Sequence, residues 1–256
     1  MDPSPILALC VGFGLILFGN MLEGGHISSL IQPTAGLIVL GGTLGATWLA
    51  STNDEIKLLA KLLRQVFRPP AARRRQLIDE MVKVSTVVRR EGMLAVEGLI
   101  EEIENDFLKR GLRMLVDGAS AEDVKRVLEP EIDINEHHGT CAGKVLESAG
   151  GFSPTIGILG AVLGLIHVMQ NLSDPSKLGA GIAVAFVATI YGVGFANLLF
   201  LPLGSRIKKI VAIEAETQQM VLAGVLGIAA GVNARQIEEM LAVYAEHEKH
   251  GKKEAA

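Results

Sequence analysis

Two long apolar segments between residues 148 and 205, joined by a short polar loop, constrain this chain more than any other feature. Between Glu147 and Arg206 the Asp, Glu, Lys and Arg residues are limited to Asp174 and Lys177, and both fall in that loop. The hydrocarbon core of a bilayer is roughly 30 Å thick and takes about 20 residues of helix to cross. Each segment is long enough to do so, and the pair predicts a transmembrane helical hairpin.

Small residues recur at four-residue intervals along both segments. They are Gly160, Gly164, Ala188, Gly192 and Ala196. Because apolar burial gives helices no reason to associate in lipid, small faces that let two backbones approach closely favour packing there. Thr189 and Tyr191 interrupt the second segment. The residues alone leave two interpretations open: a structural hairpin whose Thr189 hydroxyl bonds back to its own helix, or the wall of a pore.

The N-terminal region predicts another membrane hairpin. Residues 3–22 contain no Asp, Glu, Lys or Arg, which predicts a span from about Pro5 to Leu22, and Pro33 begins a second span that runs to about Ala50. The segment lacks the basic leader and the small-residue cleavage site of a secretory signal, so we expect the first span to be retained. Four spans place both termini on one side of the membrane.

Basic residues assign that side to the cytoplasm. Of the 24 Lys and Arg residues, 16 lie between Ser51 and Glu147 and seven lie from Arg206 onward. Cationic residues accumulate on the cytoplasmic side of membrane proteins, so both hydrophilic regions are expected there. The net charge of -4 argues against nucleic acid as a partner. Cys10 and Cys141 offer no disulfide framework and are interpreted as packing residues.

The sequence therefore predicts an all-α membrane protein with four transmembrane helices in two hairpins. Apolar residues between the hairpins recur at helical spacing, and no strand pattern is convincing, which favours a helical cytoplasmic domain. The expected divisions are residues 1–50 for the first hairpin, 51–147 for the cytoplasmic domain, 148–205 for the second hairpin and 206–256 for a helical C-terminal tail.

Local signals in the hydrophilic regions predict where helices begin and end. Ser120 followed by Asp123 forms an N-terminal capping pattern, and Asn233 is expected to cap the last helix. The prolines at 69–70 should stop one helix, and a single helix is expected around residues 97–115.

The basic cluster Arg73, Arg74 and Arg75 has two interpretations. The three cations are attracted to anionic lipid at the membrane surface, or they lie on a solvated helix face. The sequence does not decide between the two.

The sequence contains no recognisable catalytic or metal motif. It has no phosphate-cradling glycine loop, no paired cysteines at zinc spacing and no nucleophile elbow. His137, His138, His247 and His250 are interpreted as solvated surface residues, because adjacent histidines on a helix point in different directions and a tail pair has no preformed site. We expect no enzyme activity, no resident metal and no cofactor.

The predicted spans carry no Asp, Glu, Lys or Arg. Ionisable groups inside a membrane mark ion paths because they are costly to keep there. His167 is the one titratable candidate, and near the end of its span it is interpreted as an interfacial residue. If ions cross at this hairpin, the carboxylate that binds them must come from another chain.

Two sequence strings carry a family resemblance: FSPTIGILGAVLGLI at 152–166 and AVAFVATIYGVGFANLLFLPL at 183–203. Together with GGT at 41–43 and the long helical loop, they resemble the flagellar stator channel subunits known as MotA, or PomA in the sodium-driven version. The resemblance implies a multi-pass protein of the bacterial inner membrane, in which five copies surround a dimer of a single-span, peptidoglycan-binding partner, MotB or PomB. An aspartate of that partner carries the ion.

The resemblance also implies roles for individual residues. Pro154 and Pro202 match prolines implicated in the conformational step that follows protonation of the partner. Arg89, Arg90 and Glu97 fall on the charged positions of a segment that pushes on the rotor protein FliG. On their own, these charges would be a plain solvated face.

Ion choice depends on residues of the second hairpin. The expected ion-path residues are Ala161, Thr189 and Tyr191. Thr189 matches a threonine of both ion classes, whereas sodium-type members carry a second threonine where this chain has Ala161. A dehydrated sodium ion needs several oxygen ligands, so the loss of that hydroxyl favours a proton.

Other functions compete with a stator. An ExbB- or TolQ-like energiser of the outer membrane shares the glycine-rich third span, but it has one span before the cytoplasmic loop where this chain has two. A solute carrier would need an inverted repeat, which the two hairpins do not show. A membrane scaffold that conducts no ions stays open.

Overall fold

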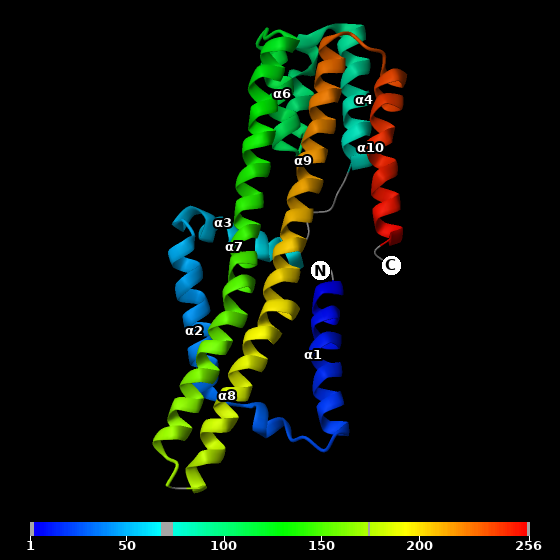
Figure 1. Ribbon diagram of the computed structural model, residues 1–256. Coiled ribbons are helices and arrows are strands. Elements are labelled where there is room, and N and C mark those ends of the chain that lie inside the picture. Colours follow the sequence, from blue (N-terminus) through cyan, green and yellow to red (C-terminus); the bar gives the residue numbers. More distant parts are fainter. Residues whose placement is uncertain (1–2, 68–73, 174, 255–256) are drawn as a thin grey trace. The chain divides into compact units, whose positions relative to one another are not determined.

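The computed structural model describes residues 3–67, 74–173 and 175–254, and throughout these residues the regular structure is helical (Figure 1). The prediction of an all-α protein is confirmed for this part of the chain. The elements are α1 (Ser4–Leu22), η1 (Ile27–Leu30), α2 (Pro33–Ala50), α3 (Asn53–Phe67), α4 (Arg74–Glu91), η2 (Met93–Val96), α5 (Glu97–Glu102), α6 (Asp106–Val116), α7 (Ala121–Gln170), α8 (Pro175–Phe195), η3 (Ala196–Phe200), α9 (Leu201–Ala229) and α10 (Ala234–Glu254).

The helices divide into two compact units. The first unit combines Met1–Pro70 with His138–Ile210, and the second combines Ala71–His137 with Val211–Ala256. Helices α7 and α9 each contribute residues to both units. Most of the region between the hairpins and most of the C-terminal region therefore share one core, whereas α3 belongs to the first unit.

Four helical stretches among the described residues are long and apolar enough to cross a membrane. They are Ser4–Leu22, Pro33–Ala50, part of Ala121–Gln170 and part of Leu178–Ala229. The first two begin and end within one residue of the predicted spans.

The two prolines of the second hairpin occupy different places in their helices. Pro154 lies inside α7, which begins at Ala121, and Pro202 lies near the start of α9, which continues to Ala229. Proline removes one backbone N–H and crowds the carbonyl four residues earlier. Ahead of Pro202 the chain accommodates this with the π-helical turn η3, where the N–H of Leu201 donates to the Ala196 carbonyl.

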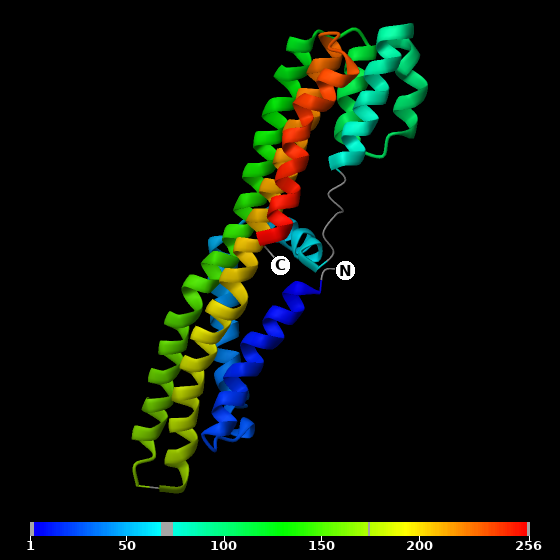
Figure 2. The ribbon, with the colours of Figure 1, turned by 90° about the vertical axis from the view of Figure 1, so that its right-hand side faces the viewer.

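The first unit is built on close contact between the C-terminal part of α7 and α8, which run side by side in both views (Figure 2). A Cβ added at Gly157 would lie 2.9 Å from the Ala188 carbonyl oxygen, and one added at Gly164 would lie 2.8 Å from the Ala185 nitrogen. The predicted small-residue faces therefore do let the two backbones meet.

Helix α2 packs against α8 through another buried cluster. Its core is Ala35, Val39, Val187 and Ala188. The Tyr191 ring lies beside this cluster and 5.6 Å from the Phe195 ring, measured between centroids. This packing fixes α2 on the hairpin.

The second unit has a larger aliphatic core. Its fully buried side chains include Ile78, Met81, Leu112, Leu128 and Val225, which come from α4, α6, α7 and α9. The prediction of a single helix at residues 97–115 is wrong. The region forms two helices, since α5 ends at Glu102 and α6 begins at Asp106. The side chain of Asn105 accepts a hydrogen bond from the Leu108 N–H and so starts a new helix there.

Both predicted helix caps are confirmed. The Ser120 hydroxyl accepts a hydrogen bond from the Asp123 N–H at 3.1 Å, and the Asn233 side-chain oxygen accepts from the Gln236 N–H at 2.8 Å. Helix α3 ends at Phe67, and the prolines at 69–70 fall outside the described residues.

Arg74 of the basic cluster lies neither on a solvated helix face nor on a surface that could meet lipid. Its side chain is 3% exposed, and its guanidinium donates to the Thr217 hydroxyl and to the Ile213 and Tyr244 carbonyls, each at 3.0 Å. Arg75 forms surface ion pairs instead, and Arg73 lies outside the described residues. Four acceptors from α9 and α10 converge on Arg74, since the Glu216 carboxylate also lies 3.0 Å from its guanidinium, and together they compensate for its burial.

Candidate functional site

Ala161 and Thr189 lie at the same level of the second hairpin. Ala161 directly follows Gly160, and Thr189 directly follows Ala188. These preceding residues make a close contact between the helices, since a Cβ added at Gly160 would lie 2.8 Å from the Ala188 Cβ. Both side chains are partly buried. The structure therefore places two of the predicted ion-path residues at the same level of the hairpin, and their part in an ion path stays a prediction.

Thr189 and Tyr191 lie on nearly opposite faces of α8, because two positions along a helix differ by about 200°. The Thr189 hydroxyl donates to the Ala185 carbonyl one turn earlier, at 3.3 Å. The Tyr191 hydroxyl donates to the Leu30 carbonyl at 2.6 Å and accepts from the Gln32 N–H at 3.3 Å. Tyr191 thereby holds the segment that leads into α2, and its part in an ion path stays a prediction.

The two prolines occupy different levels of the helix pair. Pro154 follows Ser153, whose buried hydroxyl donates to the Gly192 carbonyl on α8 at 2.9 Å. Pro202 follows Leu201, whose side chain would touch a Cβ added at Gly150. Each proline is thus next to a residue that makes a tight contact between α7 and the helical segment formed by α8, η3 and α9.

Sequence reasoning missed the Ser153 hydrogen bond. The bond gives the Gly192 carbonyl a side-chain donor from the other helix within the apolar hairpin. Serine is one of the small residues that occur at membrane helix contacts, and its four-residue spacing from Gly157 is the signal that could have found it.

A half-buried ion pair closes the hydrophilic end of the hairpin. The Lys208 ammonium lies 2.7 Å from a Glu147 carboxylate oxygen, and a Cβ added at the neighbouring Gly143 would lie 3.2 Å from the Gly204 carbonyl oxygen. The sequence placed these two charges just outside the apolar segments but did not pair them. The pair ties α7 to α9 where the apolar packing ends.

In the second unit, the predicted rotor-contact residues surround a sharp turn. Arg89 and Arg90 end α4, Gly92 turns the chain with a φ of +89°, and Glu97 begins α5. All three charged side chains are exposed, and within the described part of the chain none has an ion-pair partner. Leu94, between them, is 74% exposed. An apolar side chain bordered by uncompensated charges is a surface suited to another protein.

Two other acidic groups of this unit have clear partners. Hydrogen bonds from Arg113 and Lys109 hold the pKa of Glu101 below its usual value. The Ser120 hydroxyl, which donates to Asp123 at 2.6 Å, likewise lowers the pKa of that carboxyl. These acids stabilise local structure and are already satisfied.

Histidine and cysteine side chains do not form a candidate metal centre in the part of the chain that the structure describes. His137 and His138 both lie on α7. The side chains of His247 and His250 are outside the described set.

Two family models match the chain. The model described as MotA/TolQ/ExbB proton channel family covers residues 99–221, and the model described as Motility protein A N-terminal covers residues 6–92. Together they span both apolar hairpins and most of the region between them.

Individual relatives match over nearly the full length. Motility protein A from Helicobacter pylori is 34% identical over 95% of this chain and 95% of that protein. The solved structure of C. jejuni MotAB superposes with a TM-score of 0.90 at 32% identity, covering 95% of this chain and 96% of that chain. The flagellar MotAB stator complex from Bacillus subtilis gives a TM-score of 0.85 at 32% identity, with coverages of 94% and 95%. The chain belongs to the MotA/TolQ/ExbB proton channel family, in its MotA/PomA group of flagellar motor stator subunits.

Proposed function

We propose that this subunit forms, with a single-span MotB-type partner, a proton channel whose ion flow generates torque on the rotor protein FliG. The observation that carries the proposal is the second hairpin, whose two helices are in backbone contact and which holds no Asp or Glu between Glu147 and Arg206 outside its loop. A wall of this kind needs a second polypeptide to supply the acid. The relatives solved as MotAB complexes support such a partner.

The proposed topology has four membrane spans in two hairpins, with both termini in the cytoplasm of a bacterial cell and the spans in its inner membrane. Support comes from the four long apolar helices and from α1, whose Leu7, Val11 and Leu15 are all more than half exposed. Such a surface is stable in lipid or against neighbouring subunits. We propose that five copies surround two partner chains.

The proposed coupling step begins when a proton neutralises the aspartate of the partner. Neutralising a charge in a low-dielectric site changes its interaction energy with the surrounding wall by several kcal/mol, which is enough to switch between two packed states. In this chain the proposed wall includes Ala161 and Thr189. Pro154 and Pro202 are the proposed positions at which the backbone of the wall bends. The proton is the transported ion, and no bound cofactor takes part.

The proposed rotor contact is the turn at Gly92, with Arg89, Arg90 and Glu97 around it. These charges have no described partner within the chain, so a complementary surface can engage them without first breaking an ion pair. Charges at the rim of a contact chiefly set specificity and association rate.

An ExbB- or TolQ-like energiser is the alternative within the same family. Two apolar helices, α1 and α2, precede the hydrophilic region here, and a motility-type N-terminal model matches them. Both observations favour the stator.

Reconstitution tests the proposal directly. The full chain is placed in vesicles with and without a single-span partner, and proton entry is followed with an internal pH-sensitive dye. We expect flux with the partner present, and loss of that flux when the partner's membrane aspartate is changed to asparagine. Flux through this chain alone, or no flux from a complex that restores swimming, would contradict the proposal.

A further inference from the structure

Helix α3 lies across one end of the first membrane hairpin. It begins at Asn53, shortly after α2 ends at Ala50, and it contacts α1. Figures 1 and 2 both show it running from the end of α2 to the N-terminal end of α1. Because α1 and α2 run in opposite directions, these two ends lie on the same side of the hairpin. Helix α3 therefore lies at the level where the hairpin leaves the membrane in the proposed topology.

Two exposed side chains mark this level. Trp48, the single Trp of the chain, is in the last turn of α2 and is 68% exposed, and the neighbouring Leu49 is 91% exposed. Trp side chains concentrate at the membrane–water interface, where the ring is partly in the apolar region and its N–H reaches the headgroups. These side chains indicate that the corner between α2 and α3 lies at the level of the lipid headgroups.

Helix α3 has two distinct faces. Its buried face is aliphatic and consists of Leu59, Leu62 and Val66. Its exposed face carries three cations, which are Lys57, Lys61 and Arg64. Their spacing of four and then three residues places them in one stripe along the helix, about 10 Å long. The aliphatic face packs within the first unit, so the cationic stripe is directed away from it.

The negative charges of α3 are satisfied at its start. Asp54 and Glu55 lie in the first turn and have partners there, which are Lys57 at 3.5 Å and the Thr52 N–H at 2.7 Å. Lys61 and Arg64 follow in the later turns. Within the described part of the chain neither of them has an ion-pair partner. Two positive charges of the stripe are therefore not balanced by the protein.

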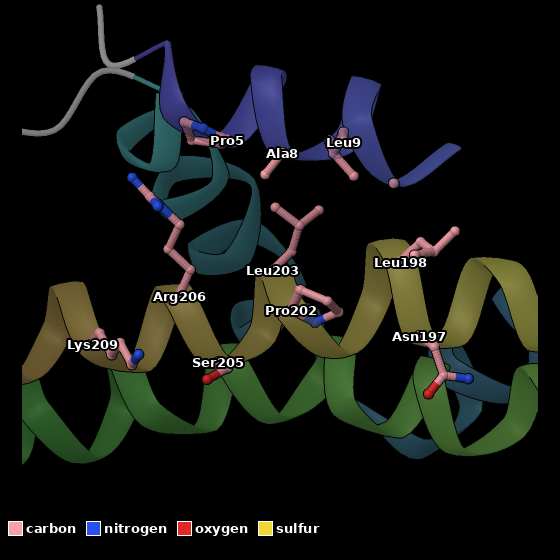
Figure 3. Close-up of a pocket in the computed structure, with 11 residues that line it drawn as sticks. Pro5, Ala8, Leu9, Asn197, Leu198, Pro202, Leu203, Ser205, Arg206 and Lys209 are labelled. Atoms are coloured by element: carbon pink, nitrogen blue, oxygen red, sulfur yellow. The ribbon is translucent and has the colours of Figure 1, made fainter. Parts of the chain in front are cut away.

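A second basic surface of the first unit differs in this respect. It is a pocket of about 460 Å³ between α1 and the η3–α9 segment, lined by Arg206 and Lys209 (Figure 3). Arg206 is already engaged within the chain, in part through the Ser4 hydroxyl at 3.3 Å. The stripe on α3 is the surface at which two cations remain together for an outside anion.

We propose that Lys61 and Arg64 bind the phosphate groups of anionic phospholipids in the cytoplasmic leaflet and so hold α3 at the membrane surface. The inference rests on the membrane placement put forward above. Basic side chains near an anionic leaflet are attracted to it, and their long stems let the charge reach the headgroups. A soluble phosphate offers the same charge, but the exposed Trp48 and Leu49 at the start of the helix favour a lipid.

Hydrogen exchange of the intact complex in bilayer discs tests the inference. The full chain and its single-span partner are assembled in discs of phosphatidylcholine alone or with an equal amount of phosphatidylglycerol. Exchange at the backbone amides of α3 and α6 is followed by mass spectrometry. We expect exchange in α3 to be at least about fivefold slower in the anionic discs, because opening of the helix releases its cations from the surface. Exchange in α6, in the second unit, should be the same in both.

Charge variants locate the effect. The double variant Lys61→Gln, Arg64→Gln should lose the difference between the two discs, whereas Lys61→Arg, Arg64→Lys should keep it. The matched control is Lys125→Gln, Arg235→Gln, which removes two exposed cations of the second unit and changes the net charge by the same amount. This control should keep the difference. All variants are compared for assembly size and helix content, so that loss of lipid dependence is not confused with loss of the fold.

Three results would overturn the inference. The first is equal exchange of α3 in the two kinds of disc. The second is a difference that survives Lys61→Gln, Arg64→Gln, which would locate the anion elsewhere. The third is equal protection by millimolar inorganic phosphate in neutral discs, which would identify a free-anion site. Proton flux is not part of these measurements, so failure of the proposed channel would appear as absent flux with the lipid dependence of α3 intact.

Discussion

The Nε of Arg74 donates a hydrogen bond to the hydroxyl of Thr217, which lies 143 residues further along the chain, at 3.0 Å. The same guanidinium reaches the Tyr244 carbonyl on α10, and it forms an ion pair with Glu216 at 3.0 Å. The Thr217 hydroxyl in turn donates a hydrogen bond to the Ile213 carbonyl at 2.8 Å. One buried side chain thus joins the start of α4 to two helices from the C-terminal region.

Replacing Arg74 with alanine should destabilise the second unit by about 2–3 kcal/mol, because a charged group that satisfies several buried acceptors is removed. The measurement is native-state hydrogen exchange at the backbone amides of α4 and α10. A loss of this size corresponds to roughly 30- to 150-fold faster exchange wherever exchange requires the unit to open. Arg75→Ala is the neighbouring control: its side chain is 61% exposed, so the cost should stay below about 1 kcal/mol. Equal effects of both variants would show that burial of Arg74 contributes nothing.

Replacing Gly157 with alanine should weaken the second hairpin. The new methyl would lie 2.9 Å from the Ala188 carbonyl oxygen and 3.0 Å from the Gly192 Cα, so two backbones must move apart. Overpacking of this kind typically costs about 1–3 kcal/mol. Gly151→Ala on the same helix is the control, because nothing lies within 4 Å of its added Cβ. The temperature at which the purified complex dissociates should fall for the first variant and not for the second. The reverse order would contradict the packing described here.

Sequence periodicity and charge were enough to predict the apolar helices and the small-residue faces, because both depend on local composition. They could not predict that α7 continues without interruption from Ala121 through Pro154. Proline usually ends or kinks a helix, because it removes one backbone N–H and crowds the preceding turn, so the local sequence at Pro154 favours a helix end. The burial of Arg74 was equally hidden, since its acceptors come from residues 213–244 and no local pattern links them to α4. The sequence also could not show that Ala161 and Thr189 lie at the same level, because that depends on how α7 and α8 are aligned in the hairpin.

Reversing charge at the Gly92 turn should abolish swimming without affecting membrane insertion. Arg90→Glu and Glu97→Lys each change an exposed side chain that has no described ion-pair partner, so the fold loses no internal contact. Swimming in soft agar and the amount of protein in the membrane fraction are measured together. Arg235→Glu is the control, because this residue is also exposed and lies in the same unit but away from the turn. Normal swimming with Arg90→Glu and Glu97→Lys would contradict the proposal that these residues contact the rotor.

The N-terminus of α7 should lose stability in acid. Hydrogen bonding to Ser120 lowers the pKa of Asp123 below the ordinary value of an aspartate, so its carboxylate stabilises the folded state at pH values above the unfolded pKa. This contribution disappears as the pH falls through the folded-state pKa. Asp123→Asn keeps a capping side chain but cannot titrate. The difference in amide exchange at the first turn of α7 between this variant and the unmodified protein should therefore be present at pH 6 and disappear as the pH falls through the lowered pKa of Asp123. A difference that stays constant across this range would show that the charge has no role.

Swimming driven by this subunit should not depend on sodium. At the level where α7 and α8 make contact, Thr189 offers a hydroxyl, already donating to the Ala185 carbonyl, and Ala161 offers none. A sodium ion must replace its hydration shell with several oxygens, whereas a proton needs one acceptor and a chain of water. Swimming speed should be the same in sodium and potassium media at equal pH and ionic strength, and should fall when the proton gradient is dissipated. Ala161→Thr adds one oxygen at this level, which is too few to coordinate sodium, so the variant should remain proton-driven. Swimming by the unmodified protein that stops without sodium would refute the assignment, and sodium dependence that appears only in the variant would show that one hydroxyl suffices.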